Sequence, residues 1–377
     1  MIAPVRAALL GLGLWLLGAT AWSQGVTPRT IVLGQSAPLS GPLQSAGEDV
    51  RNGALAYFRR LNDAGGVHGR RIELATLDDA GDAARTLANT TRFVEEFKVF
   101  ALFGYADAGM TRELLALSHK AGVPLFGPVT GAAIARQPER SVFTVRAGRA
   151  DEIESVISHY AQLGLKRFAL LRADDPAGAE FLAAARSALA RRGLAAPVDA
   201  ALKQSSDGAA GLAREIFVAD PDVVVIALPQ PPAADLVRAL RRAGRGTQIV
   251  ALSPADPERL AEALGRDGAG VTLSQVLPPL ARVSLPVVAA YRAAIEAETG
   301  RNAYAPASFE AYIAASVFAE AVRRVGPALT RNALLRALEA MSYHDAGGHI
   351  VGFSRTNRQG SARTYLMALT RDGTLLH

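Results

Sequence analysis

Apolar runs alternate with amphipathic stretches along the first half of the chain. Runs such as TIVLGQSA at 30–37 and VFALFGY at 99–105 are typical of buried strands. Between them, apolar residues recur every three or four positions, as expected of helices with one buried face. The expected strands cover 30–37, 71–77, 99–105 and 123–127, and the expected helices cover 49–62, 82–97 and 111–121. Strands separated by helices of this length predict a parallel sheet with right-handed crossovers.

The same alternation restarts near residue 142 and predicts a second α/β unit. The run DVVVIAL at 222–228 is almost continuously apolar, as a strand covered on both faces must be. The expected strands are 142–146, 167–172, 222–228, 247–252 and 270–277, and the expected helices are 151–163, 178–191 and 233–243. Helices over 285–299, 306–325 and 330–341 follow, then strands over 349–354 and 364–371. This order predicts two lobes to which the chain returns, with crossings near Val145 and Val276 and a ligand cleft between the lobes.

The N-terminus has the three parts of an export signal. Arg6 supplies a positive charge, residues 7–17 are apolar, and Ala21-Trp22-Ser23 fits a cleavage site. The apolar run is too short to span a bilayer core of about 30 Å. We expect cleavage after Ser23, with Ala21 as the alternative, and a soluble exported protein. In a bacterium with an outer membrane this means the periplasm.

Composition excludes several kinds of chemistry. The chain has 377 residues, half of them apolar, which fits two or three domains with a sizeable core. It has no cysteine, so disulfides, thiolate metal sites and thiol nucleophiles are excluded. The net charge of +6 comes from bases that are spread along the helices. Nucleic-acid binding, which needs clustered bases with aromatics between them, is therefore not expected.

Catalytic and cofactor motifs are also missing from the sequence. It contains no G-x-S-x-G elbow, H-E-x-x-H motif or P-loop, and no G-x-G-x-x-G follows the strand expected over 30–37. The run Asp78-Asp79-Ala80-Gly81-Asp82 lacks the other positions of a calcium loop and its closing glutamate. We interpret it as a strand end followed by a helix that Asp82 caps. No enzyme activity, metal or cofactor is expected.

Six motifs, in this order and spacing, resemble a known family. They are GQSAPLSGP at 34–42, LNDAGGVHGRRIEL at 61–74, LDDAGD at 77–82, FALFGY at 100–105, AGVPLFGPVTGA at 121–132 and APASFEAYIAAS at 305–316. Over residues 28–377 the chain resembles type I periplasmic binding proteins, and more narrowly the leucine/isoleucine/valine-binding proteins of ABC importers.

The resemblance implies an α/β fold of two doubly wound parallel-sheet lobes joined by a three-crossover hinge. The expected division is a signal peptide over 1–23, a first lobe of 24–145 plus 278–342, and a second lobe of 146–277 plus 343–377. The resemblance also implies a monomer without catalysis that closes on a small molecule and docks onto a membrane permease.

The positions that bind ligand in this family differ here. Family members that bind amino acids hold the ligand carboxylate with Ser or Thr hydroxyls after the third and fourth strands. The first position falls in Asp107-Ala108-Gly109, without a hydroxyl, and the second falls at Gly131, beside Thr130. The acid that usually pairs with the ligand ammonium corresponds to Ser253, and the aromatics that usually cover the ligand correspond to Ala46, Ala177 and Pro229.

These differences predict a ligand other than leucine, isoleucine or valine. An unpaired buried ammonium costs several kcal/mol, so a small organic carboxylate or a related polar metabolite is expected. The residues expected to line the site are Ser40, Gln44, Tyr105, Asp107, Ala108, Thr130, Gly131, Arg149, Gln230, Ser253 and Tyr312.

Alternatives remain open for three of these residues and for the function. Arg149 either pairs with a ligand carboxylate or lies on the surface at a helix start. Asp107 either accepts an ammonium or caps a helix, and Tyr312 either lines the cleft or packs on a helix face. The fold also suits a ligand-sensing receptor subunit. An exported α/β enzyme is disfavoured by the missing catalytic set.

Overall fold

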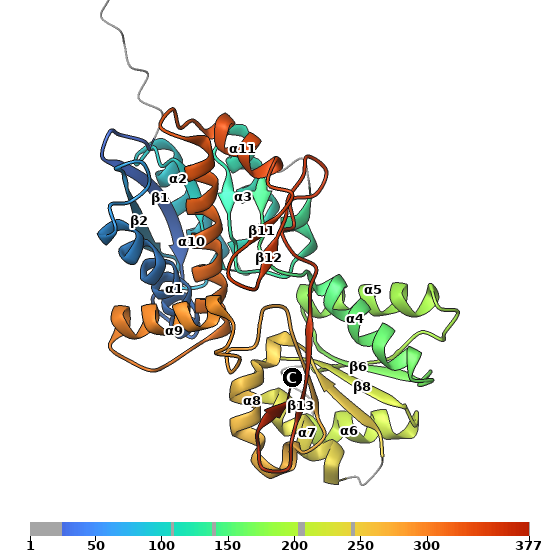
Figure 1. The fold of residues 1–377 in the computed structure, drawn as a ribbon. Coiled ribbons are helices and arrows are strands. Elements are labelled where there is room, and N and C mark those ends of the chain that lie inside the picture. Colours follow the sequence, from blue (N-terminus) through green and yellow to red (C-terminus); the bar gives the residue numbers. More distant parts are fainter. Residues whose placement is uncertain (1–24, 107–108, 138–140, 203–207, 243–245, 377) are drawn as a thin grey trace, which may run out of the picture.

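The computed structural model describes residues 25–106, 109–137, 141–202, 208–242 and 246–376. It has two lobes, each built on its own sheet (Figure 1). The expected signal peptide and its cleavage site lie outside the described residues. Among the helices described, none is long and apolar enough to cross a membrane.

The first lobe contains a parallel five-stranded sheet in the order β2-β1-β3-β4-β5. Its strands are β1 (Thr30–Ala37), β2 (Arg71–Asp78), β3 (Ala101–Phe103), β4 (Leu125–Phe126) and β5 (Val142–Phe143). Its early helices are α1 (Gln44–Asp63), α2 (Ala83–Glu95) and α3 (Arg112–Lys120). The expected strand over 30–37 is confirmed to the residue. Stacked and edge-on phenylalanines fill the core, with Phe103, Phe126 and Phe318 in mutual contact.

The second lobe contains a seven-stranded sheet in the order β14-β13-β10-β9-β8-β6-β7. Its strands are β6 (Phe168–Ala173), β7 (Val198–Leu202), β8 (Val223–Ala227), β9 (Gln248–Ala251), β10 (Thr272–Gln275), β13 (Tyr365–Leu369) and β14 (Leu375–Leu376). Its helices are α4 (Arg149–Gln162), α5 (Pro176–Ala190), α6 (Gly208–Val218), α7 (Pro232–Arg242) and α8 (Pro257–Leu264). The sequence patterns missed β7, α6 and α8. The last two strands, β13 and β14, are antiparallel to their neighbours, and the remaining strands are parallel.

The chain then returns to the first lobe. Helices α9 (Pro286–Thr299), α10 (Pro306–Val325) and α11 (Arg331–Glu339) pack there, with α10 alongside α1 (Figure 1). The hairpin β11 (His344–Asp345) and β12 (Ile350–Val351) also belongs to this lobe, which corrects the expected placement of all of 343–377 in the second lobe. The hairpin packs on the first lobe because the ring of Phe353, which follows β12, lies edge-on against that of Phe143, with the ring centroids 5.3 Å apart.

Three segments therefore connect the lobes, as expected: 144–148, 276–285 and 354–364. The first and third segments are hydrogen-bonded to each other. The Thr144 amide donates to the Arg358 carbonyl at 3.1 Å, and the Gly360 amide donates to the Thr144 carbonyl at 2.7 Å. The hinge thus contains a short piece of paired backbone.

The acidic run after β2 has the structural role that the sequence predicted. Asp82 caps α2 by accepting the Arg85 amide at 2.8 Å. Asp78 accepts the Leu39 amide at 2.7 Å and the Ser40 hydroxyl at 2.6 Å, so it holds the loop that follows β1. These carboxylates shape two loops at the end of the sheet.

The contact between α1 and α10 depends on one glycine. A Cβ on Gly53 would lie 1.9 Å from the carbonyl oxygen of Ser308, which is backbone and cannot rotate away. We predict that Gly53→Ala lowers the free energy of unfolding by about 1–3 kcal/mol, as overpacking does, although alanine favours helix. Thermal or urea unfolding measures this. Gly246→Ala is the control because nothing lies within 4 Å of its Cβ position, and equal stability of the two variants would contradict the prediction.

Candidate functional site

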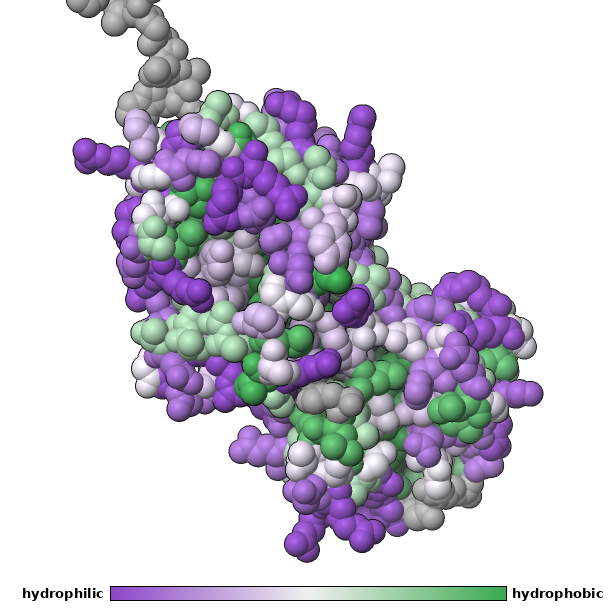
Figure 2. All heavy atoms as spheres, in the orientation of Figure 1, coloured by the Kyte–Doolittle hydropathy of each residue, from purple (hydrophilic) through white to green (hydrophobic). Residues whose placement is uncertain are grey.

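Two adjoining cavities occupy the cleft between the lobes. Their volumes are about 240 and 280 Å³, and they share Val129, Arg146 and Ser253. Hydrophilic side chains cover much of the outer faces of both lobes, and hydrophobic side chains are visible near the junction between them (Figure 2). The 280 Å³ cavity lies at the carboxyl ends of strands, where open α/β sheets bind ligands.

The loop after β4 forms one wall of the 280 Å³ cavity. Thr130 is buried, and its hydroxyl accepts the Ala132 amide at 3.0 Å. The Gly131 carbonyl accepts the Arg149 amide at 3.0 Å. A Cβ on Gly131 would lie 2.9 Å from Arg149 Cγ and 3.4 Å from Arg146 Nη2. The glycine therefore lets two arginine side chains lie against this loop.

Both arginines have a carboxylate partner. Arg149, the first residue of α4, donates from Nη1 to Glu180 Oε2 at 2.8 Å. Arg146 lies in the first lobe connection, and its Nη1 is 3.4 Å from Glu310 Oε2. Arg149 thus begins a helix, as one of the two alternatives has it, but it is buried in the cleft wall and does not lie on the surface. Arg146 and Glu310 were missed, because their proximity depends on segments 164 residues apart.

A third arginine, Arg136, holds this loop to the hinge. It lies in the short 3-10 helix η2 (Ala133–Arg136) and is mostly buried. Its Nη2 donates to the carbonyls of Thr130 at 3.1 Å and Ala147 at 3.2 Å, and its Nε donates to Gln359 Oε1 at 3.0 Å. Burial lowers the pKa of Arg136 to about 10, so it remains charged at neutral pH. No sequence signal pointed to it.

Ser253 stands where the resemblance led us to expect an acid, yet an acid lies directly behind it. The Ser253 amide donates to Glu152 Oε1 at 2.7 Å, and its hydroxyl donates to Glu152 Oε2 at 2.8 Å. Glu152 lies on α4 and is completely buried, and burial raises the pKa of its carboxyl group. The carboxylate is therefore present near this wall, but it is supplied by a different element.

The 240 Å³ cavity combines carboxylates with apolar walls. Its polar residues are Asp49, Arg146, Ser253, Asp256, Arg259, Gln275 and Glu310, and its small or apolar residues include Ala46, Val276, Leu277 and Ala305. Burial raises the pKa of Asp49 to about 6, and it also raises the pKa of Asp256. Near pH 6 the Asp49 carboxyl group is therefore partly protonated and can either donate or accept a hydrogen bond.

Four of the expected site residues lie in the cleft walls: Thr130, Gly131, Arg149 and Ser253. The three positions expected to cover the ligand, Ala46, Ala177 and Pro229, also line the cleft. Asp107 and Ala108 lie outside the described residues.

The other expected site residues lie elsewhere. Tyr105 is fully buried in the first lobe, with its hydroxyl 3.0 Å from that of Thr90. Ser40 and Gln44 are exposed and line neither cavity, and Gln44 instead donates to Glu48 at 3.0 Å. The structure therefore does not bring these three residues into the walls of the two cleft cavities.

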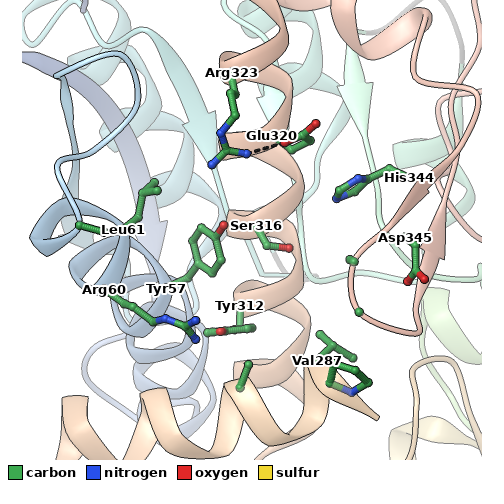
Figure 3. Close-up of a pocket in the computed structure, with 15 residues that line it drawn as sticks. Tyr57, Arg60, Leu61, Val287, Tyr312, Ser316, Glu320, Arg323, His344 and Asp345 are labelled. Atoms are coloured by element: carbon green, nitrogen blue, oxygen red, sulfur yellow. Dashed lines mark hydrogen bonds and ion pairs between the residues drawn. The ribbon is translucent and has the colours of Figure 1, made fainter.

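Gln230 and Tyr312 also line neither cleft cavity. Gln230 precedes a cis peptide bond to Pro231, and its buried side-chain nitrogen has no hydrogen-bond partner among the described residues. Tyr312 packs edge-on against Tyr57 at 5.2 Å between ring centroids, so its helix-packing alternative holds. It lines a separate pocket of the first lobe (Figure 3).

The described residues contain no group of three or more His, Asp or Glu side chains placed to hold a metal ion. Two sheet-based lobes, three connecting segments and a polar cleft between the lobes instead define a bilobal ligand-binding protein.

Comparison with known proteins identifies the family. The profile of the periplasmic binding protein family matches residues 30–374, so the chain belongs to this family of substrate-binding proteins.

Three relatives illustrate the similarity. An amino acid binding protein of Pseudomonas aeruginosa is 26% identical over 217 residues. The matched region is 57% of this chain and 58% of that protein, which is less than two thirds of its length. A Leu/Ile/Val-binding protein of Rhizobium johnstonii is 24% identical over 82% of this chain and 83% of its own length. The crystal structure of an extracellular ligand-binding receptor from Verminephrobacter eiseniae has 27% identity and a TM-score of 0.82, covering 92% of this chain and all of that one.

The raised pKa of Asp49 predicts a pH-dependent effect on stability. The folded protein binds the Asp49 proton more tightly than the unfolded chain, because the pKa rises from 3.8 to about 6. The cost of burying the charge is therefore absent below pH 3.8 and complete above pH 6. We predict that Asp49→Asn raises the melting temperature at pH 8 and that this gain disappears near pH 4.

Scanning calorimetry across this pH range measures the effect. Asp63→Asn is the control because it removes an exposed carboxylate at the end of the same helix. An Asp49→Asn variant that is less stable at pH 8, or equally stabilised at both pH values, would contradict the prediction.

Proposed function

We propose that this protein is exported to the periplasm, captures a small organic carboxylate in the interlobe cleft, and delivers it to the permease of an ABC importer. Amino acid-like metabolites fall within this class. The observation that carries the proposal is the pair of arginine side chains, Arg146 and Arg149, that lie against the loop at Gly131 and line the same cavity. Family membership supports capture without turnover.

The carboxylate end of the ligand fits beside this arginine pair. A guanidinium has five N–H donors in a planar fork and can hold more than one acceptor. The loop at Gly131 belongs to the first lobe, Arg149 begins the first helix of the second lobe, and Arg146 lies in the connection between them. A ligand held at this point contacts both lobes and therefore favours the closed state.

The opposite end of the ligand lies in the 240 Å³ cavity, which is lined by different side chains. The 240 Å³ cavity has small apolar walls, which leave space for a ring or a branched chain. Asp49, Asp256 and Gln275 line the same space and can bind a hydroxyl or an ammonium group. This supports a carboxylate whose far end carries a hydrogen-bond donor.

The polar groups do not match the expected pattern for leucine, isoleucine or valine. The hydroxyl of Thr130 is engaged with the Ala132 amide, and that of Ser253 is engaged with Glu152. The cations that replace them favour a ligand whose carboxylate dominates recognition. We therefore propose that branched-chain amino acids are not the preferred ligands.

Calorimetric titration tests the ligand class. With a panel of amino acids and of aliphatic and aromatic carboxylates, we predict measurable binding of a carboxylate and no micromolar binding of leucine. Arg149→Ala should weaken that binding at least tenfold, or about 1.4 kcal/mol. Gly131→Ala should also weaken it, because the added methyl would lie 2.9 Å from Arg149 Cγ.

Arg214→Ala is the matched control, because Arg214 is an exposed arginine on α6 whose described hydrogen bond goes to the Ala210 carbonyl. Micromolar leucine binding, or unchanged carboxylate affinity in Arg149→Ala, would contradict the proposal. Unchanged uptake of the bound carboxylate in a deletion strain would favour the receptor alternative.

Closure is tested separately. We predict that the radius of gyration falls when the tightest-binding carboxylate of the panel saturates the protein, because contacts with both lobes draw them together. Small-angle X-ray scattering with and without ligand measures this. An unchanged radius at saturation would contradict closure while leaving the titration result intact.

A further inference from the structure

A further cavity, of about 450 Å³, lies on the first lobe away from the cleft (Figure 3). We call it the α1–α10 pocket, defined by Tyr57, Arg60, Tyr312, Glu320, Arg323 and His344. The start of α9 and the residues after β11 complete its walls. Among the described residues that line it, none lines either cleft cavity.

Two tyrosines converge in this pocket. The rings of Tyr57 and Tyr312 meet edge-on, with centroids 5.2 Å apart. Figure 3 shows Tyr57 crossing the space between α1 and α10, and the Arg60 guanidinium pointing toward Tyr312. Burial raises the pKa of both phenols, so both keep a proton that they can donate at neutral pH. The walls thus offer aromatic surface and hydroxyl donors together.

The charges in the pocket favour an anion. Glu320 is shared by two guanidinium groups, those of Arg323 and Arg324, and is therefore neutralised. Asp345 accepts the Gly348 amide of its own turn. Within the part of the chain that the structure describes, no carboxylate forms an ion pair with Arg60. Its guanidinium therefore supplies positive charge at the mouth of an aromatic pocket.

His344 adds a neutral polar group to the opposite wall. It is half-buried, and burial lowers the pKa of its imidazole, so the ring is neutral at neutral pH. A neutral imidazole donates from one nitrogen and accepts at the other. It can therefore bind a polar substituent of a molecule whose charged end lies at Arg60.

We propose that the α1–α10 pocket is a second binding site, for a small organic anion with a planar apolar part. Arg60 binds the anionic group, the Tyr57 and Tyr312 hydroxyls donate hydrogen bonds to it, and the tyrosine rings cover the apolar part. Ligand pockets typically have volumes of about 300–1,000 Å³ and are apolar with a few convergent polar groups. All walls belong to the first lobe, so the site does not require closure of the cleft and does not depend on the function proposed above.

Fluorine NMR on protein labelled with 3-fluorotyrosine tests this site, with benzoate as the probe. The chain has eight tyrosines, and no tyrosine among the described residues lines either cleft cavity. We expect benzoate to shift the Tyr57 and Tyr312 resonances saturably, with the signals assigned by Tyr→Phe substitution. Arg60→Gln should raise the apparent Kd at least tenfold.

Arg59→Gln is the matched control, since Arg59 is the neighbouring arginine on α1 and pairs with Glu298 at 3.0 Å. Arg59→Gln and the cleft variant Arg149→Ala should both leave the shifts of Tyr57 and Tyr312 unchanged. Either of two results would overturn the site: no saturable shift up to about 10 mM benzoate, or equal affinity in Arg60→Gln and the unmodified protein. Dispersed spectra of each variant establish that it is folded. Failure of this site would leave binding in the cleft unaffected, and failure of the cleft proposal would leave these shifts unaffected.

Discussion

The arrangement of the cleft depends on one partly buried cation, Arg136. Its guanidinium binds the carbonyl of Thr130 in the ligand-facing loop and that of Ala147 in the first lobe connection. Its Nε binds Gln359 in the third connection, and Gln359 in turn donates to Asp151 at 2.6 Å. Carbonyl groups surround this charge. Among the described residues, no carboxylate forms an ion pair with it. Because a partly buried charge needs hydrogen-bond partners, these contacts constrain the positions of the Thr130 and Ala147 carbonyls.

The consequence of this network reaches the ligand-facing side chains. Asp151 also accepts a hydrogen bond from the Gly148 amide at 2.8 Å and so helps to cap the N-terminus of α4. Arg149 follows in the first turn of that helix, and Arg146 precedes it in the connection. The position of both arginines is therefore tied to the same network that joins the first and third lobe connections. The cleft-lining arginines and the hinge segments are thus positioned by one set of hydrogen bonds.

Local features of the fold were predictable from the sequence, and features assembled from distant segments were not. The strand over 30–37 and the cap at Asp82 each depend on residues close together in the chain, and both are confirmed. The placement of 343–353 was wrong because an apolar residue such as Phe353 signals burial but not against which lobe. Tyr105 was misplaced for a similar reason. It was expected at the end of the strand over 99–105, whereas its side chain turns toward Thr90 on α2.

The same division applies to the cleft. Thr130, Gly131 and Ser253 were expected because the family resemblance places ligand-binding positions after strand ends, and the structure puts all three in the walls of the cleft. The pairs Arg146–Glu310 and Ser253–Glu152 join segments more than 100 residues apart, so no local pattern reveals them. Gly131 shows how this changes the interpretation. In the sequence, Gly131 stands where the family pattern has a residue with a hydroxyl. In the structure, any residue larger than glycine at this position would collide with Arg149 and crowd Arg146. The missing side chain thus leaves room beside this loop for two arginine side chains, each of which is paired with a carboxylate.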